Sequence, residues 1–286
     1  MQIMRWKTWL KTTLIAGALV SLAAPVEALA PSETLRLAPH RAVYDMSLDG
    51  TGSGSGLSGI RGRMVFDFAG SSCEGYTLNM RMVTHVTDRS GRTTLTDLRS
   101  STWEDGKGEL FRFNSRRFLN QKLNETTRGN ASQVSPGGGL EVKLNAPKSG
   151  KLSLDGKFLF PTQHSLAILD AAESGRSMVQ ANVYDGSEQG KKAYATTAFI
   201  GKLRAPGSEE ALKPVENGSV LGKLRSWPVT ISYFDKAKDG DPVPSYQLTF
   251  QLYANGVSRK LRIDYGDFAV RGSLSSLEFF EETKCR

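Results

Sequence analysis

Along most of the chain, apolar side chains alternate with polar ones in short runs that end at glycine-rich or polar turns. Alternation with a period of two residues is typical of antiparallel strands that bury one face. We therefore expect a series of strands, most of them paired as hairpins. The predicted strands are residues 40–48, 60–68, 76–82, 93–103, 110–113, 118–123, 140–144, 178–184, 193–202, 229–233, 246–252, 261–265 and 268–280. Residues 152–160 are expected to form either a further strand or an irregular approach to a helix.

One segment, residues 161–175, breaks this pattern and predicts a helix. Thr162 is of the type that caps helix N-termini, and a glycine stands at the far end as a stop. Between them Leu166, Leu169 and Ala172 recur at helical spacing. It is the most convincing helix of the sequence.

Residues 49–59 are rich in glycine and serine and predict a mobile loop. Within them Gly54, Gly56 and Gly59 have the spacing of a dinucleotide-binding fingerprint. That fingerprint requires a helix after the glycines, because the helix N-terminus holds the pyrophosphate. A strand is predicted here instead, so we expect a loop and not a nucleotide site.

Many one-sided antiparallel strands have to curl in order to hide their apolar face and to limit exposed edges. The pattern therefore predicts a mainly β fold, an antiparallel barrel, spiral or sandwich with one or two short helices. A transmembrane outer-membrane barrel is the competing fold. It is disfavoured because the strands carry charges on their polar faces, no aromatic girdle repeats, and the chain does not end on an aromatic strand.

The N-terminus has the features of a secretory signal peptide. Basic residues precede a short apolar segment at residues 14–22, and small residues follow it. We predict a cleaved signal peptide of residues 1–28, with 1–30 as the alternative, and a single domain over residues 29–286. The apolar segment is about half of the roughly 20 residues that a membrane span needs. The expected product is soluble, not membrane-spanning, and exported.

The charge of the chain is modest. Its 286 residues include 37 Lys and Arg against 29 Asp and Glu, and the basic residues are scattered. The densest basic cluster, residues 112–117, is interleaved with Phe111, Phe113 and Phe118 and alternates as a strand does. A nucleic-acid reader would need a concentrated basic face. We therefore expect no nucleic-acid partner, whereas weak attraction to an anionic membrane surface or glycan stays open.

The chain has only two cysteines, Cys73 in the turn at residues 70–75 and Cys285 at the penultimate position. In an exported protein such a pair is most simply a disulfide. The bond requires the two backbones to lie side by side in the fold, which favours one domain. It would close a loop of about 212 residues and remove roughly 5 kcal/mol of unfolded-state freedom. Two reduced thiols, or a bond between two molecules, are the alternatives.

Recognised metal and nucleophile motifs do not occur in the sequence. His40, His85 and His164 are far apart and lack the spacing of metal ligands, and two cysteines cannot form a usual structural zinc site. No nucleophile elbow occurs either. We expect no metal and no cofactor.

Two pairs of neighbouring acids are the remaining catalytic candidates, Glu104 with Asp105 and Asp239 with Asp241. Such a pair can serve glycoside hydrolysis only if the fold sets the two carboxyls about 5 to 10 Å apart in a cleft. Neighbouring acids are more often solvated turn residues, and we expect no enzyme. His164, at the opening of the predicted helix, would be the first residue to examine if activity were found.

Several motifs stand in a fixed order along the chain: residues 37–45, 72–76, 96–104 and 160–164, followed by Cys285. With these motifs the chain resembles the EipB-like cell envelope integrity proteins of Gram-negative bacteria. The resemblance implies a periplasmic, spiral-like broken antiparallel β-barrel, similar in fold to lipoprotein carriers. It also implies an internal disulfide between Cys73 and Cys285, a role in envelope integrity, and genetic links to tetratricopeptide-repeat partners. It brings no catalytic residues.

These observations favour a non-enzymatic periplasmic binding or scaffold module that supports cell envelope integrity. The alternative is a carrier of an apolar ligand, a lipid or a lipoprotein acyl chain, held in a β-lined cavity under the predicted helix. Four methionines on the apolar strand faces would suit such a cavity. They are Met46, Met64, Met80 and Met82. A hydrolase of envelope glycans is the third hypothesis.

Overall fold

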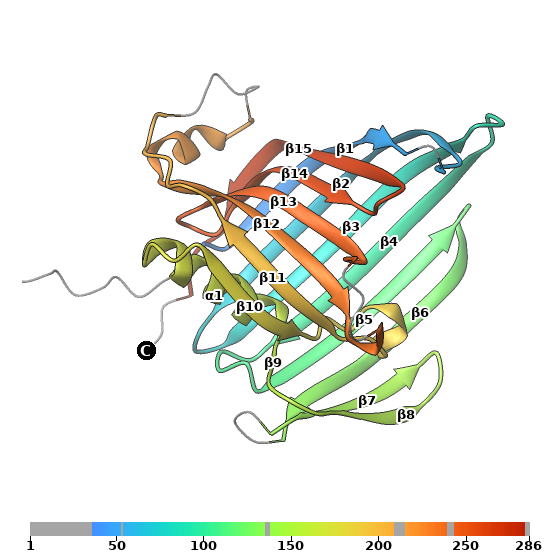
Figure 1. The fold of residues 1–286 in the computed structure, drawn as a ribbon, viewed down its shortest axis with the longest axis horizontal. Helices are drawn as coiled ribbons and strands as arrows, with labels where there is room; N and C mark the ends of the chain where they lie inside the picture. Colours follow the sequence, from blue (N-terminus) through green and yellow to red (C-terminus); the bar gives the residue numbers. More distant parts are fainter. Residues whose placement is uncertain (1–35, 53, 135–137, 209–214, 239–242, 284–286) are drawn as a thin grey trace, which may run out of the picture. The chain divides into compact units, whose positions relative to one another are not determined.

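One curled sheet of 15 strands dominates the described part of the chain (Figure 1). The computed structural model describes residues 36–283 except 53, 135–137, 209–214 and 239–242, and these residues belong to one compact unit, Leu35–Arg286. The strands are β1 (His40–Thr51), β2 (Leu57–Ser71), β3 (Gly75–Asp88), β4 (Thr93–Glu104), β5 (Leu110–Leu119), β6 (Lys122–Gln133), β7 (Leu140–Ala146), β8 (Gly150–Leu154), β9 (Phe158–Leu159), β10 (Met178–Val183), β11 (Tyr194–Ile200), β12 (Ser226–Asp235), β13 (Tyr246–Tyr253), β14 (Ser258–Asp264) and β15 (Phe268–Phe279).

The described helical elements are one α-helix and three short 3₁₀ helices. They are α1 (Pro161–Glu173), η1 (Glu188–Gly190), η2 (Gly218–Lys223) and η3 (Lys236–Lys238). Within the described residues, none of these helices combines the length and the apolar character that a membrane crossing requires. The predicted signal peptide, residues 1–28, lies outside the described part of the chain.

Strands that follow each other in the chain are neighbours in the sheet, except β8 and β9, which form its two edges. From edge to edge the strand order is β8-β7-β6-β5-β4-β3-β2-β1-β15-β14-β13-β12-β11-β10-β9. All neighbours pair antiparallel except β9 and β10, which are parallel. The first strand, β1, pairs with the last, β15, and thus joins the two ends of the described chain in the middle of the sheet.

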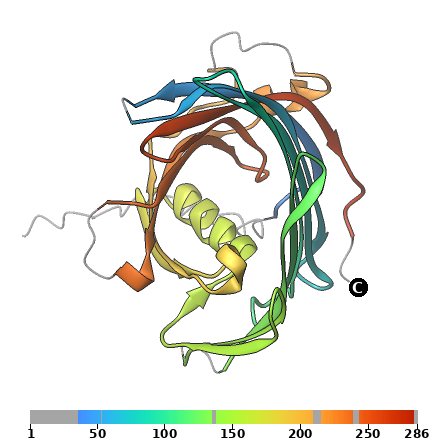
Figure 2. The same cartoon turned by 90° about the vertical axis from the view of Figure 1, so that its right-hand side faces the viewer.

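The connection between the two sheet edges forces the sheet to curl. The edge strands β8 and β9 follow each other in the chain and are separated only by residues 155–157. Such a link spans at most about 14 Å, so the two edges have to approach each other. Figure 2 shows the resulting curl, viewed along its axis. Because β8 and β9 are not paired with each other, the barrel stays open, which confirms the predicted broken β-barrel.

Apolar side chains fill the inside of the curl in three clusters. The first joins β1–β3 to β13–β15. The second is largely aromatic and includes Phe111 and Phe160, whose stacked rings lie 5.0 Å apart between centroids. In the third, Ile168 and Leu169 of α1 pack against β11–β13. The helix thus lies inside the curled sheet (Figure 2) and fills part of its interior.

One strand prediction is wrong. The predicted strand 118–123 is in fact the tight turn between β5 and β6, where Asn120 and Gln121 adopt positive φ angles of 47° and 68°. Residues 152–160, expected as a strand or as an irregular approach to the helix, contain parts of both edge strands, which are separated at Gly156 with its φ of +104°. The predicted loop 49–59 is also shorter, because β1 and β2 extend into it.

Candidate functional site

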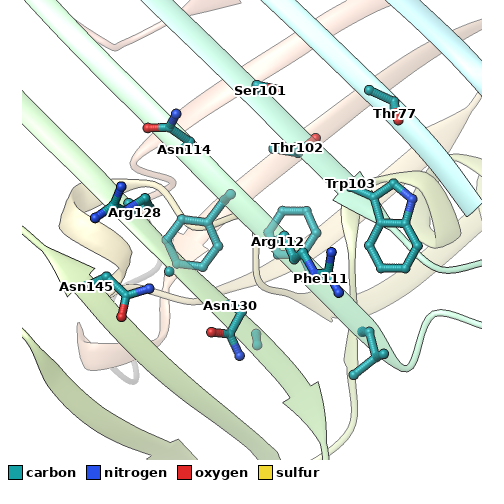
Figure 3. A pocket seen from close by; sticks show the side chains of 14 residues that line it. Thr77, Ser101, Thr102, Trp103, Phe111, Arg112, Asn114, Arg128, Asn130 and Asn145 are labelled. Atoms are coloured by element: carbon teal, nitrogen blue, oxygen red, sulfur yellow. The ribbon is translucent and has the colours of Figure 1, made fainter.

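A groove with a volume of about 610 Å³ lies on the outer face of the sheet, across β3 to β7 (Figure 3). The outward side chains that line it come from five consecutive strands and combine polar groups with Trp103 and Leu110. They are Thr77 of β3, Ser101 and Trp103 of β4, Leu110, Arg112 and Asn114 of β5, Arg128 and Asn130 of β6, and Asn145 of β7.

Alternation along β5 explains why polar groups face outward here. Phe111 and Phe113 are only 1% and 4% exposed because they belong to the inner aromatic cluster. Side chains of a strand alternate between the two faces, so Arg112 and Asn114 point to the outside. The ladder pairs Arg112 with Asn130 and Asn114 with Arg128, which continues the polar surface onto β6.

A second hollow of about 250 Å³ adjoins the first, because Ser101 and Asn114 line both. It extends the polar surface to β2 and β3 and adds further charged residues. These are Asp67, Arg81, Arg99 and Arg116, with Asn79 beside them. We call the two hollows together the outer groove.

Three arginines of the outer groove stand in one row across the strands. Arg81 lies directly opposite Arg99, and Arg99 lies directly opposite Arg116. Like charges in such positions destabilise a sheet. Asp97 offsets part of this cost, since it accepts hydrogen bonds from Arg81 and Arg99 at 2.9 and 2.7 Å. These two arginines lower the pKa of Asp97 to about 2.

The third arginine of the row is not neutralised. Arg116 is exposed and forms no salt bridge with any described residue. Arg112 and Arg128 likewise have no carboxylate partner within the described chain, although the Arg112 guanidinium lies 4.9 Å from the centre of the Trp103 ring. This cation–π contact holds Arg112 in place within the groove. The outer groove therefore presents fixed positive charge together with amide and hydroxyl groups.

Glu104 is a buried carboxylate that holds the start of α1. The helix begins after Phe160, which offers no side-chain cap, and Pro161 follows. Glu104, 2% exposed, accepts hydrogen bonds from the backbone N–H groups of Thr162 at 2.8 Å and Gln163 at 3.0 Å. Burial raises the pKa of Glu104 to about 7. The prediction that Thr162 caps the helix is wrong, because the acceptor at the helix N-terminus is Glu104 of β4, which is distant in the sequence.

The first predicted acid pair has structural partners. Asp105 accepts backbone N–H bonds from Glu109 and Leu110 at 2.6 and 2.7 Å, in the turn between β4 and β5. Glu104 accepts backbone N–H bonds at the start of α1. Both carboxyl groups of the pair are therefore hydrogen-bonded to backbone N–H groups. The second pair, Asp239 and Asp241, lies outside the described residues.

The three histidines are not brought together. His40 is buried and its Nδ1 lies 2.7 Å from the carbonyl oxygen of Ala38. His85 is exposed on β3. His164 is buried on α1 beside Thr196, with 3.2 Å between Nε2 and Oγ1, and burial lowers its pKa to about 4. Among the described residues no group of three or more acidic, histidine or cysteine side chains is arranged to hold a metal.

The interior, which the carrier hypothesis would use, is lined by apolar groups. Met46 is 3% exposed in the first cluster, and Met64 and Met82 are partly buried against it. Met80 is half-buried and lies opposite Phe66 on the neighbouring strand. The four methionines therefore lie on one face, as the alternation predicts.

Cys73 is exposed in the turn between β2 and β3, whereas Cys285 lies outside the described residues. The predicted bond between them therefore stays a prediction.

Sequence reasoning missed the outer groove. Each strand shows only its own alternation, and the row of arginines forms through the register of β3, β4 and β5. The one signal available was the basic segment at residues 112–117, of which Arg112 and Arg116 reach the outer groove.

The fold and the groove together define a class of protein: a broken antiparallel β-barrel that encloses a helix and carries an arginine-lined groove on its outer face. The sequence model of the EipB-like family matches residues 31–281. The chain belongs to this family.

A relative and a solved structure are similar over most of the chain. The cell envelope integrity protein EipB of Brucella abortus (strain 2308) is 40% identical over 260 residues, which cover 90% of this chain and 89% of that protein. The crystal structure of a β-barrel-like protein of a domain of unknown function, also from Brucella abortus, matches with a TM-score of 0.78. It is 40% identical and covers 86% of this chain and 100% of that one.

Proposed function

We propose that this chain is a non-enzymatic periplasmic protein that supports the integrity of the cell envelope and acts as a binding or scaffold module. The observation that carries the proposal is the 40% identity, over 90% of the chain, to a protein named for cell envelope integrity. Family membership and the shared fold support it.

The geometry supports binding in preference to chemistry. The outer groove offers guanidinium, amide and hydroxyl groups, which hold a ligand but lack a nucleophile activated by a neighbouring base. Glu104 and Asp105 both serve backbone N–H groups, so neither is poised toward a substrate. A tetratricopeptide-repeat envelope protein is part of this proposal as a partner, because the family resemblance implies it.

The proposal includes a disulfide bond between Cys73 and Cys285, which the oxidising periplasm would allow. The register of the sheet supports this bond. His40 of β1 pairs with Phe279 at the end of β15 on one side and with Phe68 near the end of β2 on the other side. Two strand spacings separate Phe279 from Phe68, about 10 Å. Both cysteines follow these strand ends in the chain.

The proposal is tested by deleting the gene and measuring the resistance of cells to detergent. We expect the deletion to sensitise cells and the intact chain to restore resistance. The variants Asp105→Asn and Asp239→Asn with Asp241→Asn should restore it as well, because the proposal gives these acids no chemical role. Loss of resistance in an acid variant with an unchanged melting temperature would instead support a hydrolase.

A carrier of an apolar ligand is the second candidate. It is favoured by the partly buried apolar groups inside the curl, such as Met64, Phe66 and Phe250. A carrier would retain acyl chains through purification. Mass spectrometry of an organic extract of the purified protein detects them, and their absence, together with no binding of a fluorescent fatty acid, removes this candidate.

A further inference from the structure

We propose that the outer groove binds an acidic glycan, a saccharide chain that carries carboxylate or phosphate groups. The inference rests on the proposed binding function and names the class of its ligand. Three properties of the groove carry it: its charge, its amide groups and the pairing of its strands.

The charge of the outer groove is strongly one-sided. Five arginines line it, Arg81, Arg99, Arg112, Arg116 and Arg128. The one acidic side chain among its lining residues already pairs with another arginine, which donates to it at 2.7 and 2.8 Å from outside the groove. Guanidinium groups match carboxylate and phosphate geometry. Arg81 and Arg99 share Asp97, so Arg112, Arg116 and Arg128 are the uncompensated charges of the groove, and they favour an anionic ligand.

The amide and hydroxyl groups indicate that the anion is also rich in hydroxyls. Asn79, Asn114, Asn130 and Asn145 stand on β3, β5, β6 and β7, and Ser101 stands on β4 between the first two. An amide offers both donors and an acceptor, so it can bond a hydroxyl in either direction. Spread over β3 to β7, these groups cover about 19 Å across the strands, which suits a chain more than a single small anion.

The pairing of the strands argues against an extended acidic peptide. One common way for an extended peptide to bind a sheet is to add a strand at an exposed edge, where main-chain groups are unpaired. The groove crosses β2 to β7, and each of these strands is paired on both sides. Side chains alone can therefore hold the ligand here, which favours a saccharide with charges and hydroxyls along its length.

The test is calorimetric titration of the full chain, purified from the envelope, with three hexamers: hexagalacturonate, neutral maltohexaose and hexaglutamate. We expect hexagalacturonate to bind, to weaken as salt is raised, and to bind at least about tenfold more tightly than either of the others. The variant Arg116→Ala with Arg128→Ala should lower its affinity by about tenfold or more, because it removes two uncompensated charges.

A matched control removes the same charge elsewhere. Arg61 and Arg89 are exposed, form no salt bridge with a described residue and lie outside the groove. The variant Arg61→Ala with Arg89→Ala should change affinity less than about twofold. Equal loss in both variants, equal binding of hexaglutamate, or no binding of hexagalacturonate overturns the inference. The proposed envelope role is judged separately, by detergent resistance of the deletion strain, so the two can fail independently.

Discussion

Replacing Cys73 by serine is expected to lower the free energy of unfolding by about 3 to 5 kcal/mol, because the unfolded chain would no longer be cross-linked. A bond to Cys285 would close a loop of about 212 residues, and the unfolded chain would lose roughly 5 kcal/mol of freedom. Urea unfolding with and without reductant measures the difference. Cys285→Ser should lose the same amount, and the double variant should lose no more.

The same bond has a signature that does not depend on stability. The oxidised chain should migrate faster than the reduced chain on a denaturing gel, because the cross-link keeps the unfolded polypeptide compact. Identical migration in both states, together with unchanged stability of Cys73→Ser, contradicts an intramolecular bridge. A reductant-sensitive band of twice the mass would indicate a bond between two molecules.

Replacing Glu104 by alanine is expected to cost about 2 to 4 kcal/mol of stability at about pH 5, because two buried N–H groups at the start of α1 lose their acceptor. Those groups belong to Thr162 and Gln163. Glu104→Gln keeps one acceptor oxygen and should cost less. Urea unfolding of the three proteins measures the difference.

The deficit of the alanine variant should shrink as the pH rises. The pKa of Glu104 is raised to about 7 in the folded protein, above the value near 4.3 of an unfolded chain. The folded state therefore binds more protons between these values, and the stabilisation is complete below about pH 4 and lost as pH rises through about 7. The change amounts to at most about 4 kcal/mol.

Other groups near α1 titrate in the same range, so the difference between proteins is the quantity to measure. Burial lowers the pKa of His164 to about 4, and its protonation destabilises the fold as pH falls below about 6.5. All three proteins retain His164, and its effect cancels in the comparison. A deficit that stays constant or grows from about pH 5 to about pH 8 contradicts this assignment of Glu104.

Alternation of apolar residues was sufficient to predict most strands, because each strand buries one face. It failed where a turn lacks the usual residues. Asn120 and Gln121 adopt positive φ without a glycine or proline between two apolar runs, so β5 and β6 were not separated there. It also could not show that β8 and β9 are opposite edges, because that depends on the closure of the whole sheet.

The helix was predicted at nearly its observed position, whereas its cap was not. The acceptor for Thr162 comes from Glu104, on a strand 58 residues earlier in the sequence. A local capping rule cannot find such a partner. The outer groove was missed for the same kind of reason, since Arg81, Arg99 and Arg116 become neighbours only through strand register.

The central claim is that this broken barrel serves the envelope by binding a ligand on its outer face. Its most direct test is the detergent resistance of the deletion strain expressing Arg116→Ala with Arg128→Ala, compared with Arg61→Ala with Arg89→Ala at equal protein levels. The account predicts that the groove variant fails to restore resistance while the control restores it. Full restoration by the groove variant would contradict the claim.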